Sequence, residues 1–228
     1  MRTPRLLLPL IIAAALGVEP AHAQTRRWPL DSTEGLELLN VRADAVELEG
    51  RTGIRVTRAD DYAGGETLVL VDGSDFSDGV IEIELAGEPA PDADPMMRGF
   101  VGVAFRIDAE GSGGYECFYL RPTNARAEEQ LRRNHTTQYV SHPDFPWYRL
   151  REEAPGVYES YVDLVPGAWT SVRIEVEGTS ARLYVNGSSQ PVLVVSDLKR
   201  GASSGLIGLW LHSSTVAHFR DLKVAAAG

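Results

Sequence analysis

Short stretches of alternating apolar and polar residues recur along this chain, each rich in β-branched and aromatic residues and bounded by Gly, Asp, Asn or Pro. A period of two is typical of strands, and the bounding residues are typical of the turns between them. A helical period is nearly absent, and only residues 124–131 could form a turn or two of helix. We therefore predict strands at residues 45–49, 53–58, 66–71, 79–86, 99–107, 114–121, 157–164, 168–177, 180–186, 191–195, 205–212 and 216–224.

This succession of strands predicts an all-β fold, in which two antiparallel sheets pack as a sandwich or jelly roll. One long loop insertion separates the predicted strands at 114–121 and 157–164. We expect residues 45–228 to form a single domain after an entry segment at residues 24–44, because sandwiches of about 200 residues commonly build one core.

The alternation also indicates which face of a strand is buried. In GFVGVAFRI (99–107) the large apolar residues occupy one face, and Gly102, Ala104 and Arg106 occupy the other. GLIGLWLH (205–212) repeats the arrangement, with Trp210 and His212 on the second face. These two strands predict an open surface of small, aromatic and charged side chains.

Residues 1–23 have the composition of an export signal. They contain Arg2 and Arg5, an apolar run at residues 6–16 and the ending Ala21-His22-Ala23, which predicts cleavage after Ala23. The run is too short for a membrane span, which takes about 20 apolar residues, and no later segment is longer. We therefore expect an exported protein, periplasmic or extracellular.

The chain is acidic, with a formal net charge of −10. Nucleic acids and anionic membranes are bound through accumulated positive charge, so both are excluded as partners. Cys117 is the only cysteine, which leaves no internal disulfide, and we expect its thiol to be buried.

The insertion gathers aromatic and basic residues. Residues 115–161 hold nine of the 18 aromatic side chains, and residues 121–151 hold six Arg against three acidic residues. The segment RRNHTTQYVSHPDFPWYRLR (132–151) fits neither a helix nor a strand pattern. Aromatic faces suit sugar rings and guanidinium groups suit carboxylates, so an acidic sugar would match this composition. Alternatively, these side chains could anchor the loop itself by bonding backbone carbonyls.

Three motifs carry a family resemblance: DFSDGVIEIEL, AWTSVRIEVEGTSARLYVNG and GLIGLWLHSSTVAHFRDLKV. They resemble the concanavalin A-like and laminin-G-like jelly rolls, in which a Trp-led strand precedes a Tyr-x-Asn-Gly hairpin, a Gly-x-Ile-Gly-Leu strand and a closing Phe-Arg-x-Leu-Lys strand. Within that superfamily, residues 68–224 are most similar to secreted bacterial 3-keto-disaccharide hydrolase-like domains. The resemblance implies the sandwich fold, and it is compatible with glycan binding, glycan cleavage and protein adhesion.

Candidate ligand-binding residues come from the open face and the insertion. They are Arg106, Tyr115, Tyr119, Arg121, Asn124, Arg132, Arg133, Asn134, His135, Gln138, Trp147, Trp210 and His212. If the domain is an enzyme, Glu116 and His135 are the candidate acid and base, provided that they converge on one cleft. Strict alternation places Glu116 on the face opposite to Tyr115, and Glu116 could instead form a salt bridge with Arg106.

Metal and glycosidase motifs are weak. Asp72, Asp75 and Asp78 could hold a structural Ca²⁺ or could simply form turns, and no other cofactor is expected. The Glu-x-Asp-x-Glu strand of laminarinase-type enzymes has its nearest match in Glu82-Ile-Glu84-Leu-Ala-Gly-Glu88, which differs in residue type and spacing.

Three functions remain open. We favour an exported, lectin-like domain that binds a glycan on its concave face, with the insertion as the rim and Trp210 and His212 in the floor. The first alternative is a glycan-cleaving enzyme, a 3-keto-glycoside hydrolase or lyase, as the resemblance implies. The second alternative is a protein-adhesion module.

Overall fold

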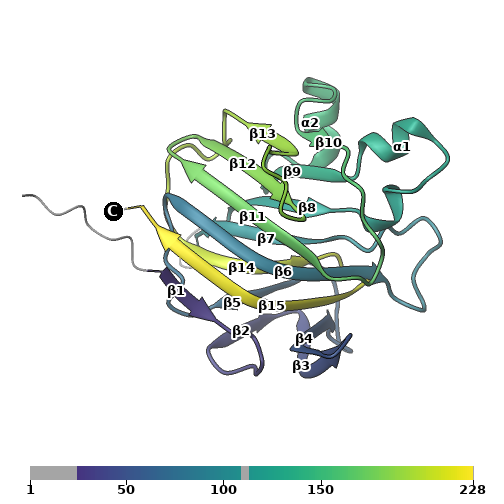
Figure 1. The fold of residues 1–228 in the computed structure, drawn as a ribbon, viewed down its shortest axis with the longest axis vertical. Coiled ribbons are helices and arrows are strands. Elements are labelled where there is room, and N and C mark those ends of the chain that lie inside the picture. The colour runs from purple at the N-terminus through teal and green to yellow at the C-terminus, as the bar shows by residue number, and fades with distance from the viewer. Residues whose placement is uncertain (1–24, 109–112, 228) are drawn as a thin grey trace, which may run out of the picture.

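The computed structural model describes residues 25–108 and 113–227, so the predicted signal at residues 1–23 lies outside the described residues. The chain folds into two antiparallel sheets packed face to face, which confirms the all-β sandwich (Figure 1). In spatial order the first sheet contains β13 (Leu193–Val195), β12 (Ser180–Val185), β11 (Thr170–Glu177), β6 (Gly79–Pro89), β15 (Thr215–Ala226), β4 (Arg51–Arg58) and β3 (Val41–Leu48), and β1 (Thr25–Trp28) also pairs with β15. The second sheet contains β10 (Glu159–Ser160), β9 (Thr137–His142), β8 (Tyr115–Leu120), β7 (Val101–Ile107), β14 (Leu206–Leu211), β5 (Leu68–Val71) and β2 (Leu36–Leu39).

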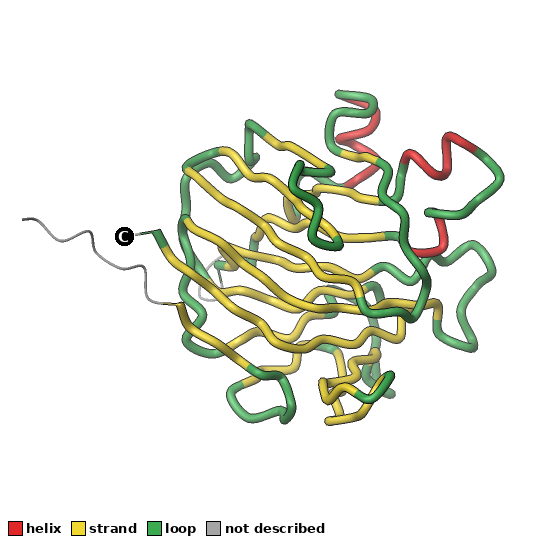
Figure 2. Tube along the Cα trace, viewed as in Figure 1, coloured by secondary structure: helices red, strands yellow, loops and turns green. Residues whose placement is uncertain are grey.

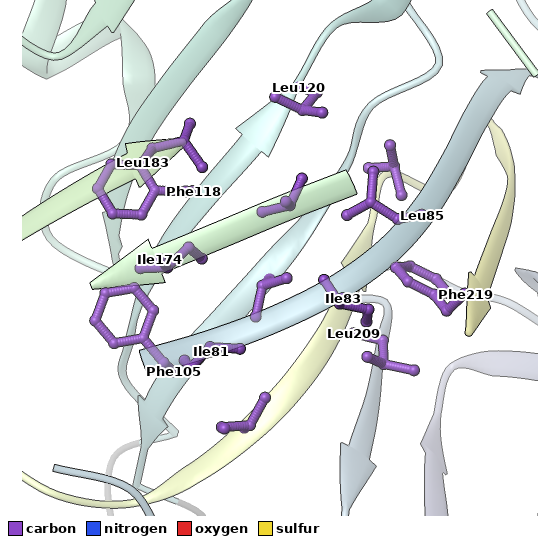
Figure 3. Packing of buried hydrophobic residues seen from close by; sticks show 14 of the residues in the cluster. Ile81, Ile83, Leu85, Phe105, Phe118, Leu120, Ile174, Leu183, Leu209 and Phe219 are labelled. Atoms are coloured by element: carbon purple, nitrogen blue, oxygen red, sulfur yellow. The ribbon is translucent and has the colours of Figure 1, made fainter. Parts of the chain in front are cut away.

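The core lies between the two sheets and consists of the apolar rows that alternation predicts. Ile81, Ile83 and Leu85 of β6 lie there together with Phe105 of β7 and Leu209 of β14 (Figure 3). Each of these side chains is at most 3% exposed. Because burial of one such side chain contributes about 1.5–3 kcal/mol, this core is the main source of stability in a chain with a single cysteine.

The insertion between β8 and β10 is more regular than the sequence predicts. It contains η1 (Pro122–Asn124), α1 (Gln130–Asn134), β9 and α2 (Trp147–Glu153), and Figure 2 shows the helices gathered at one end of the sandwich. The prediction that residues 132–151 form neither helix nor strand is therefore wrong, and of the strand predicted at 157–164 only β10 forms. β9 lacks an apolar alternation because polar side chains, Gln138 and Ser141, are buried on its two faces at 1% exposure each.

The entry segment also forms strands. β1 pairs with β15, β2 pairs with β5, and β3 begins at Val41 rather than at the predicted residue 45. β1 has the sequence TRRW, and its first three side chains are exposed. Its pairing rests on backbone hydrogen bonds, which leave no hydrophobic pattern in the sequence. Within the described residues, no helix is long and apolar enough to cross a membrane.

Candidate functional site

The second sheet carries a second apolar cluster on the face turned away from the core. Because Val103 and Leu209 point into the core, their neighbours Ala104 and Trp210 point outward, as the alternation predicts. The buried members of this outer cluster are Leu68, Leu70, Ala104, Ile107, Tyr115, Cys117 and Tyr119. Cys117 is fully buried there, which confirms that prediction, and burial raises the pKa of its thiol.

Tyr119 and Trp210 form an aromatic pair across three strands of this outer face. Tyr119 of β8 and Trp210 of β14 each lie directly opposite Gly102 of β7. Because Gly102 has no side chain, the two ring centroids approach to 4.9 Å. The Tyr119 hydroxyl accepts a hydrogen bond from Arg121 Nη2 at 2.8 Å. Burial raises the pKa of Tyr119 to about 12, so the phenol stays protonated at neutral pH.

A cavity of about 370 Å³ adjoins this pair, and we call it the aromatic hollow. Its volume falls within the range of about 300–1,000 Å³ that is typical of small-molecule sites. Rings dominate the lining, and one carboxylate and two imidazoles provide polar groups. The lining residues are Glu66, Met97, Phe100, Tyr115, Tyr119, Val140, Ser141, His142, Pro143, Pro146, Trp147, Trp210 and His212.

The Glu66 carboxylate connects several of the lining side chains. Its Oε2 accepts hydrogen bonds from the Tyr115 hydroxyl and from Trp210 Nε1, the latter at 3.3 Å. Its Oε1 lies 3.6 Å from His142 Nδ1, and the Glu66 side chain is 35% exposed. The Tyr115 and His142 rings stack with centroids 4.9 Å apart. Burial, reinforced by the Glu66 charge, raises the pKa of Tyr115 far above its usual range, so this part of the hollow combines the Glu66 carboxylate, the His142 imidazole and a protonated phenol.

His212 follows β14 and lines the same cavity. Its Nδ1 accepts a hydrogen bond from the backbone N–H of Ser214 at 3.2 Å and lies 2.7 Å from the Ser214 hydroxyl. Since a backbone N–H can only donate, the proton of the neutral ring resides on Nε2. Burial lowers the pKa of His212, and the Glu66 charge partly opposes this shift.

A second cavity of about 430 Å³ shares Phe100 and Trp147 with the aromatic hollow. We call it the basic recess. Its lining contains four Arg and one Glu, a local excess of positive charge in a chain whose formal net charge is −10. The lining residues are Met96, Arg98, Phe100, Arg121, Asn124, Glu129, Leu131, Arg132, His135, Trp147 and Arg151.

Glu159 of β10 neutralises part of this charge. Arg151 donates two hydrogen bonds to its carboxylate, at 3.0 and 2.6 Å, and Arg121 Nη1 lies 3.9 Å from Oε2. His135 Nε2 lies 3.2 Å from Oε1, and the Glu159 side chain is only 5% exposed. Burial lowers the pKa of His135, whereas the Glu159 charge raises it.

The structure brings some of the predicted ligand residues together and uses others in the scaffold. Tyr115, Tyr119, Trp147, Trp210 and His212 line the aromatic hollow, and Arg121, Asn124, Arg132 and His135 line the basic recess.

The other three predicted ligand residues of the insertion, Arg133, Asn134 and Gln138, bond to residues in the insertion or directly after it. Gln138 donates to the carbonyls of Tyr139 and Tyr158. Arg133 donates to the Tyr161 hydroxyl, and Asn134 accepts from Gln130. These contacts are the kind that the alternative of a self-anchored insertion predicts.

Arg106 does not reach the hollow, because a bulge breaks the alternation of β7. Its φ is 55°, and the register between β7 and β14 shifts between Leu206 and Gly208. The Arg106 side chain is 1% exposed and donates to Asp78 Oδ1 at 2.8 Å. It also donates to the backbone carbonyls of Ser77, Gly178 and Gly201. The residue therefore ties loops at the edge of the sandwich to β7.

Glu116 and His135 do not converge on one cleft. Glu116 is fully buried and accepts hydrogen bonds from the Tyr139 hydroxyl at 2.6 Å and the Arg200 N–H at 2.7 Å. His135 contacts Glu159 in the insertion instead. The Arg106–Glu116 salt bridge does not form either, because Arg106 pairs with Asp78. The carboxylate that lines the aromatic hollow is Glu66.

The three aspartates of VDGSDFSDG do not form a metal site. Asp78 Oδ1 accepts hydrogen bonds from Arg106 and from the Gly178 N–H, whereas Asp72 and Asp75 are exposed. Among residues 25–108 and 113–227, no group of three His, Cys, Asp or Glu side chains could hold a metal ion.

Sequence reasoning missed Glu66, His142 and Arg98. Glu66 precedes β5 and stands two residues before Leu68, so alternation could have placed it on the outer face. Its partners Tyr115 and Trp210 come from β8 and β14, and no local pattern reveals a contact between positions so distant in the chain.

Solved structures confirm the fold. A carbohydrate-binding module, CBM66 from Bacillus subtilis, is 16% identical with a TM-score of 0.53, and the match covers 83% of this chain and 95% of that one. A Bacillus subtilis protein of unknown function with a galectin-like fold is 14% identical with a TM-score of 0.54, covering 88% of this chain and 94% of that one. The Crh5 transglycosylase in complex with NAG is 10% identical with a TM-score of 0.53, covering 91% of this chain and 86% of that one.

The sequence itself matches one described family. No curated protein is significantly similar to the chain. The family model described as the 3-keto-alpha-glucoside-1,2-lyase-like domain matches residues 38–225, which include the strands that position Glu66, Tyr115 and Trp210. The resemblance stated from the motifs is therefore confirmed, and the chain belongs to the family of 3-keto-alpha-glucoside-1,2-lyase-like domains.

Proposed function

We propose that the chain binds a carbohydrate in the aromatic hollow. A pyranose ring has an apolar face of C–H groups and a rim of hydroxyls, which suit aromatic rings and a carboxylate respectively. The observation that carries this proposal is the Tyr119–Trp210 pair, at 4.9 Å, beside the Glu66 carboxylate in one cavity. The fold that the chain shares with a carbohydrate-binding module and the description of its family support the proposal.

Glycan-array binding followed by calorimetry tests the proposal. Wild type should bind at least one glycan, and Trp210→Ala or Trp147→Ala should weaken that binding about tenfold or more, because aromatic side chains that the ligand covers dominate such sites. Tyr148→Ala is the matched control, since Tyr148 neighbours Trp147 on α2 but is 61% exposed and does not line the hollow. Binding that Trp210→Ala leaves unchanged would contradict the proposal. Capture of a protein by wild type and Trp210→Ala alike, with no glycan bound, would support the adhesion function instead.

Cleavage of a 3-keto-glycoside is a second candidate function. It is favoured by the grouping of the Glu66 carboxylate with the His142 ring and the Tyr115 hydroxyl in the hollow. In such a substrate the proton on C2 is acidic because a ketone is adjacent. When a base removes that proton, the electron pair forms a C1=C2 double bond, the C1–O bond breaks, and the departing oxygen takes up a proton. Glu66 is the candidate base in the hollow, and His142, 3.6 Å away, is the candidate acid.

A panel of 3-keto-glucosides, followed by mass spectrometry of the released alcohol and the unsaturated sugar, tests this second function. Glu66→Gln should lower kcat about a hundredfold or more, because removal of a general base costs about 10²–10⁴ in rate. Binding should be weakened far less, because the Gln amide can still hydrogen-bond a sugar hydroxyl. Glu153→Gln serves as the control, since this carboxylate is exposed and does not line the hollow. Substrates that stay intact across the panel, or a rate that Glu66→Gln leaves unchanged, would contradict the assignment.

The proposed function also includes export of the protein from the cytoplasm. Residues 1–23 have the charged start, apolar run and small-residue ending of a cleaved leader. Amino-terminal sequencing of the protein recovered outside the cytoplasm should begin at Gln24, and an uncleaved cytoplasmic chain would contradict export.

A further inference from the structure

We propose that the carbohydrate bound in the aromatic hollow carries an anionic group, and that the basic recess binds this group. The inference rests on the proposed function. Its geometric basis is the shared wall, because Phe100 and Trp147 line both cavities. A ligand whose sugar ring lies in the hollow can therefore place a neighbouring ring, or a substituent, in the recess.

The recess contains two guanidinium groups without an acidic partner. Arg121 and Arg151 face the buried carboxylate of Glu159. By contrast, Arg98 and Arg132 form no ion pair with any described residue. Arg98 donates to the carbonyls of Pro95 and Met97, and Arg132 Nε donates to Asn124 Oδ1 at 3.0 Å.

Arg132 is already oriented by this neutral contact. The Asn124 side chain is itself fixed, because its Nδ2 donates to the His135 carbonyl at 3.1 Å. Only Nε of Arg132 is engaged, and its two terminal nitrogens have no partner among the described residues. A guanidinium group held by one edge can offer its other edge to a carboxylate, sulfate or phosphate.

Repulsion among the arginines of the recess also favours an anionic ligand group there. Burial lowers the pKa of Arg98, and the charges of Arg132 and Arg121 lower it further, whereas only Asp94 opposes them. Glu129 also lines the recess but is exposed, so its charge is screened by solvent. An anion between Arg98 and Arg132 would relieve this repulsion, which a neutral sugar cannot do.

Matched disaccharides test the inference. Glucosyl-glucose is compared with the same disaccharide carrying glucuronic acid, glucose 6-sulfate or glucose 6-phosphate as the second ring, and binding is measured by calorimetry at low and at 0.5 M salt. Wild type should bind at least one anionic member about tenfold more tightly than the neutral one, the scale of one charge-assisted hydrogen bond. High salt should reduce this preference. The member that gains most identifies the anion as carboxylate, sulfate or phosphate.

Substitutions test whether Arg98 and Arg132 cause the preference for anionic disaccharides. The double substitution Arg98→Gln and Arg132→Gln should abolish the preference, and an unchanged free energy of unfolding in chemical denaturation should show that the variant is folded. Arg126→Gln is the control, because Arg126 is exposed, pairs with Asp163 and does not line the recess. Equal binding of neutral and anionic members by wild type would overturn the inference, as would a preference that survives the double substitution. In either case a loss of neutral binding in Trp210→Ala would leave the proposed function standing.

Discussion

Tyr119 and Trp210 lie with ring centroids 4.9 Å apart, although β7 runs between the strands that carry them. The residue of β7 opposite both is Gly102. A Cβ atom at this position would meet the Phe118 carbonyl oxygen at 2.2 Å and the Tyr119 Cβ at 2.6 Å. The aromatic pair therefore depends on a glycine whose absent side chain leaves room for the rings.

Gly102→Ala should accordingly damage both stability and binding. We expect the free energy of unfolding to fall by about 1–3 kcal/mol, the usual cost of overpacking, because backbone and the Tyr119 Cβ must shift to admit the methyl group. Chemical denaturation measures the first effect, and calorimetry with a glycan identified on the array measures the second. Thr52→Ala, at an exposed position of β4, is the control and should change neither quantity. A fully stable Gly102→Ala protein with unchanged affinity would show that the ring pair does not require the glycine.

Substitution of Arg106 tests whether this residue stabilises the fold or binds the ligand. Arg106→Gln leaves Asp78 and three backbone carbonyls without their buried donor, so we expect a loss of about 3–5 kcal/mol in the free energy of unfolding. Glycan affinity of the folded fraction should stay unchanged, since Arg106 does not line the hollow. Arg42→Gln, which removes an exposed pair with Asp60, should cost below about 1 kcal/mol. Reduced affinity at full stability would instead return Arg106 to the list of ligand residues.

The sequence predicted the fold well because the core strands keep a strict period of two. Val103 and Leu209 point inward and Ala104 and Trp210 point outward, as alternation requires. The prediction fails at Arg106, where a non-glycine residue adopts a positive φ and forms a bulge. Sequence composition gives no sign of such a bulge, so a residue assigned to the outer face turned out to be buried among carbonyls.

The site was only partly predictable for a different reason. Aromatic enrichment of residues 115–161 identified Tyr119 and Trp147, and the alternation of residues 205–212 identified Trp210. Glu66 did not stand out, since its contacts join residues that are 49 and 144 positions away along the chain. Long-range pairing of strands decides which carboxylate enters the hollow, and that pairing follows from the whole sheet rather than from any local motif.

Glu159 should prove essential to the insertion. Glu159→Gln removes the buried anion that faces Arg121, Arg151 and His135, so we expect a loss of about 3–5 kcal/mol in the free energy of unfolding. Because the Glu159 charge raises the pKa of His135 against the effect of burial, that pKa should fall further in the variant. Denaturation and an NMR titration of the His135 ring measure the two effects.

A matched variant distinguishes this burial effect from a general loss of negative charge. Glu153→Gln removes a carboxylate from an exposed pair with Arg149 on α2, and its cost should stay below about 1 kcal/mol. Similar stability of the Glu153 and Glu159 variants would contradict the role given to the buried cluster.

His212 should make stability depend on pH below neutrality. Its pKa in the folded protein lies below the value of 6.5 for an unperturbed ring, chiefly because of burial. As pH falls below 6.5, the unfolded chain therefore takes up a proton before the folded protein does, and the free energy of unfolding decreases. The stabilising contribution is complete above pH 6.5 and is lost on acidification. His212→Asn, which can retain an acceptor for the Ser214 N–H, should flatten this dependence in denaturation curves between about pH 5 and 7.5.

His218 provides a control, because it is a buried histidine that lies outside the hollow. Its pKa is also lowered by burial, with Arg55 reinforcing the shift, but it lies on β15 of the first sheet, away from the hollow. His218→Asn should therefore flatten the pH dependence of stability in the same direction as His212→Asn. Of these two variants, only that of His212 should alter the pH dependence of glycan affinity, because His212 lines the cavity and His218 does not. An equal effect of both variants on that affinity would mean that the histidines act through overall stability, and it would remove His212 from the site.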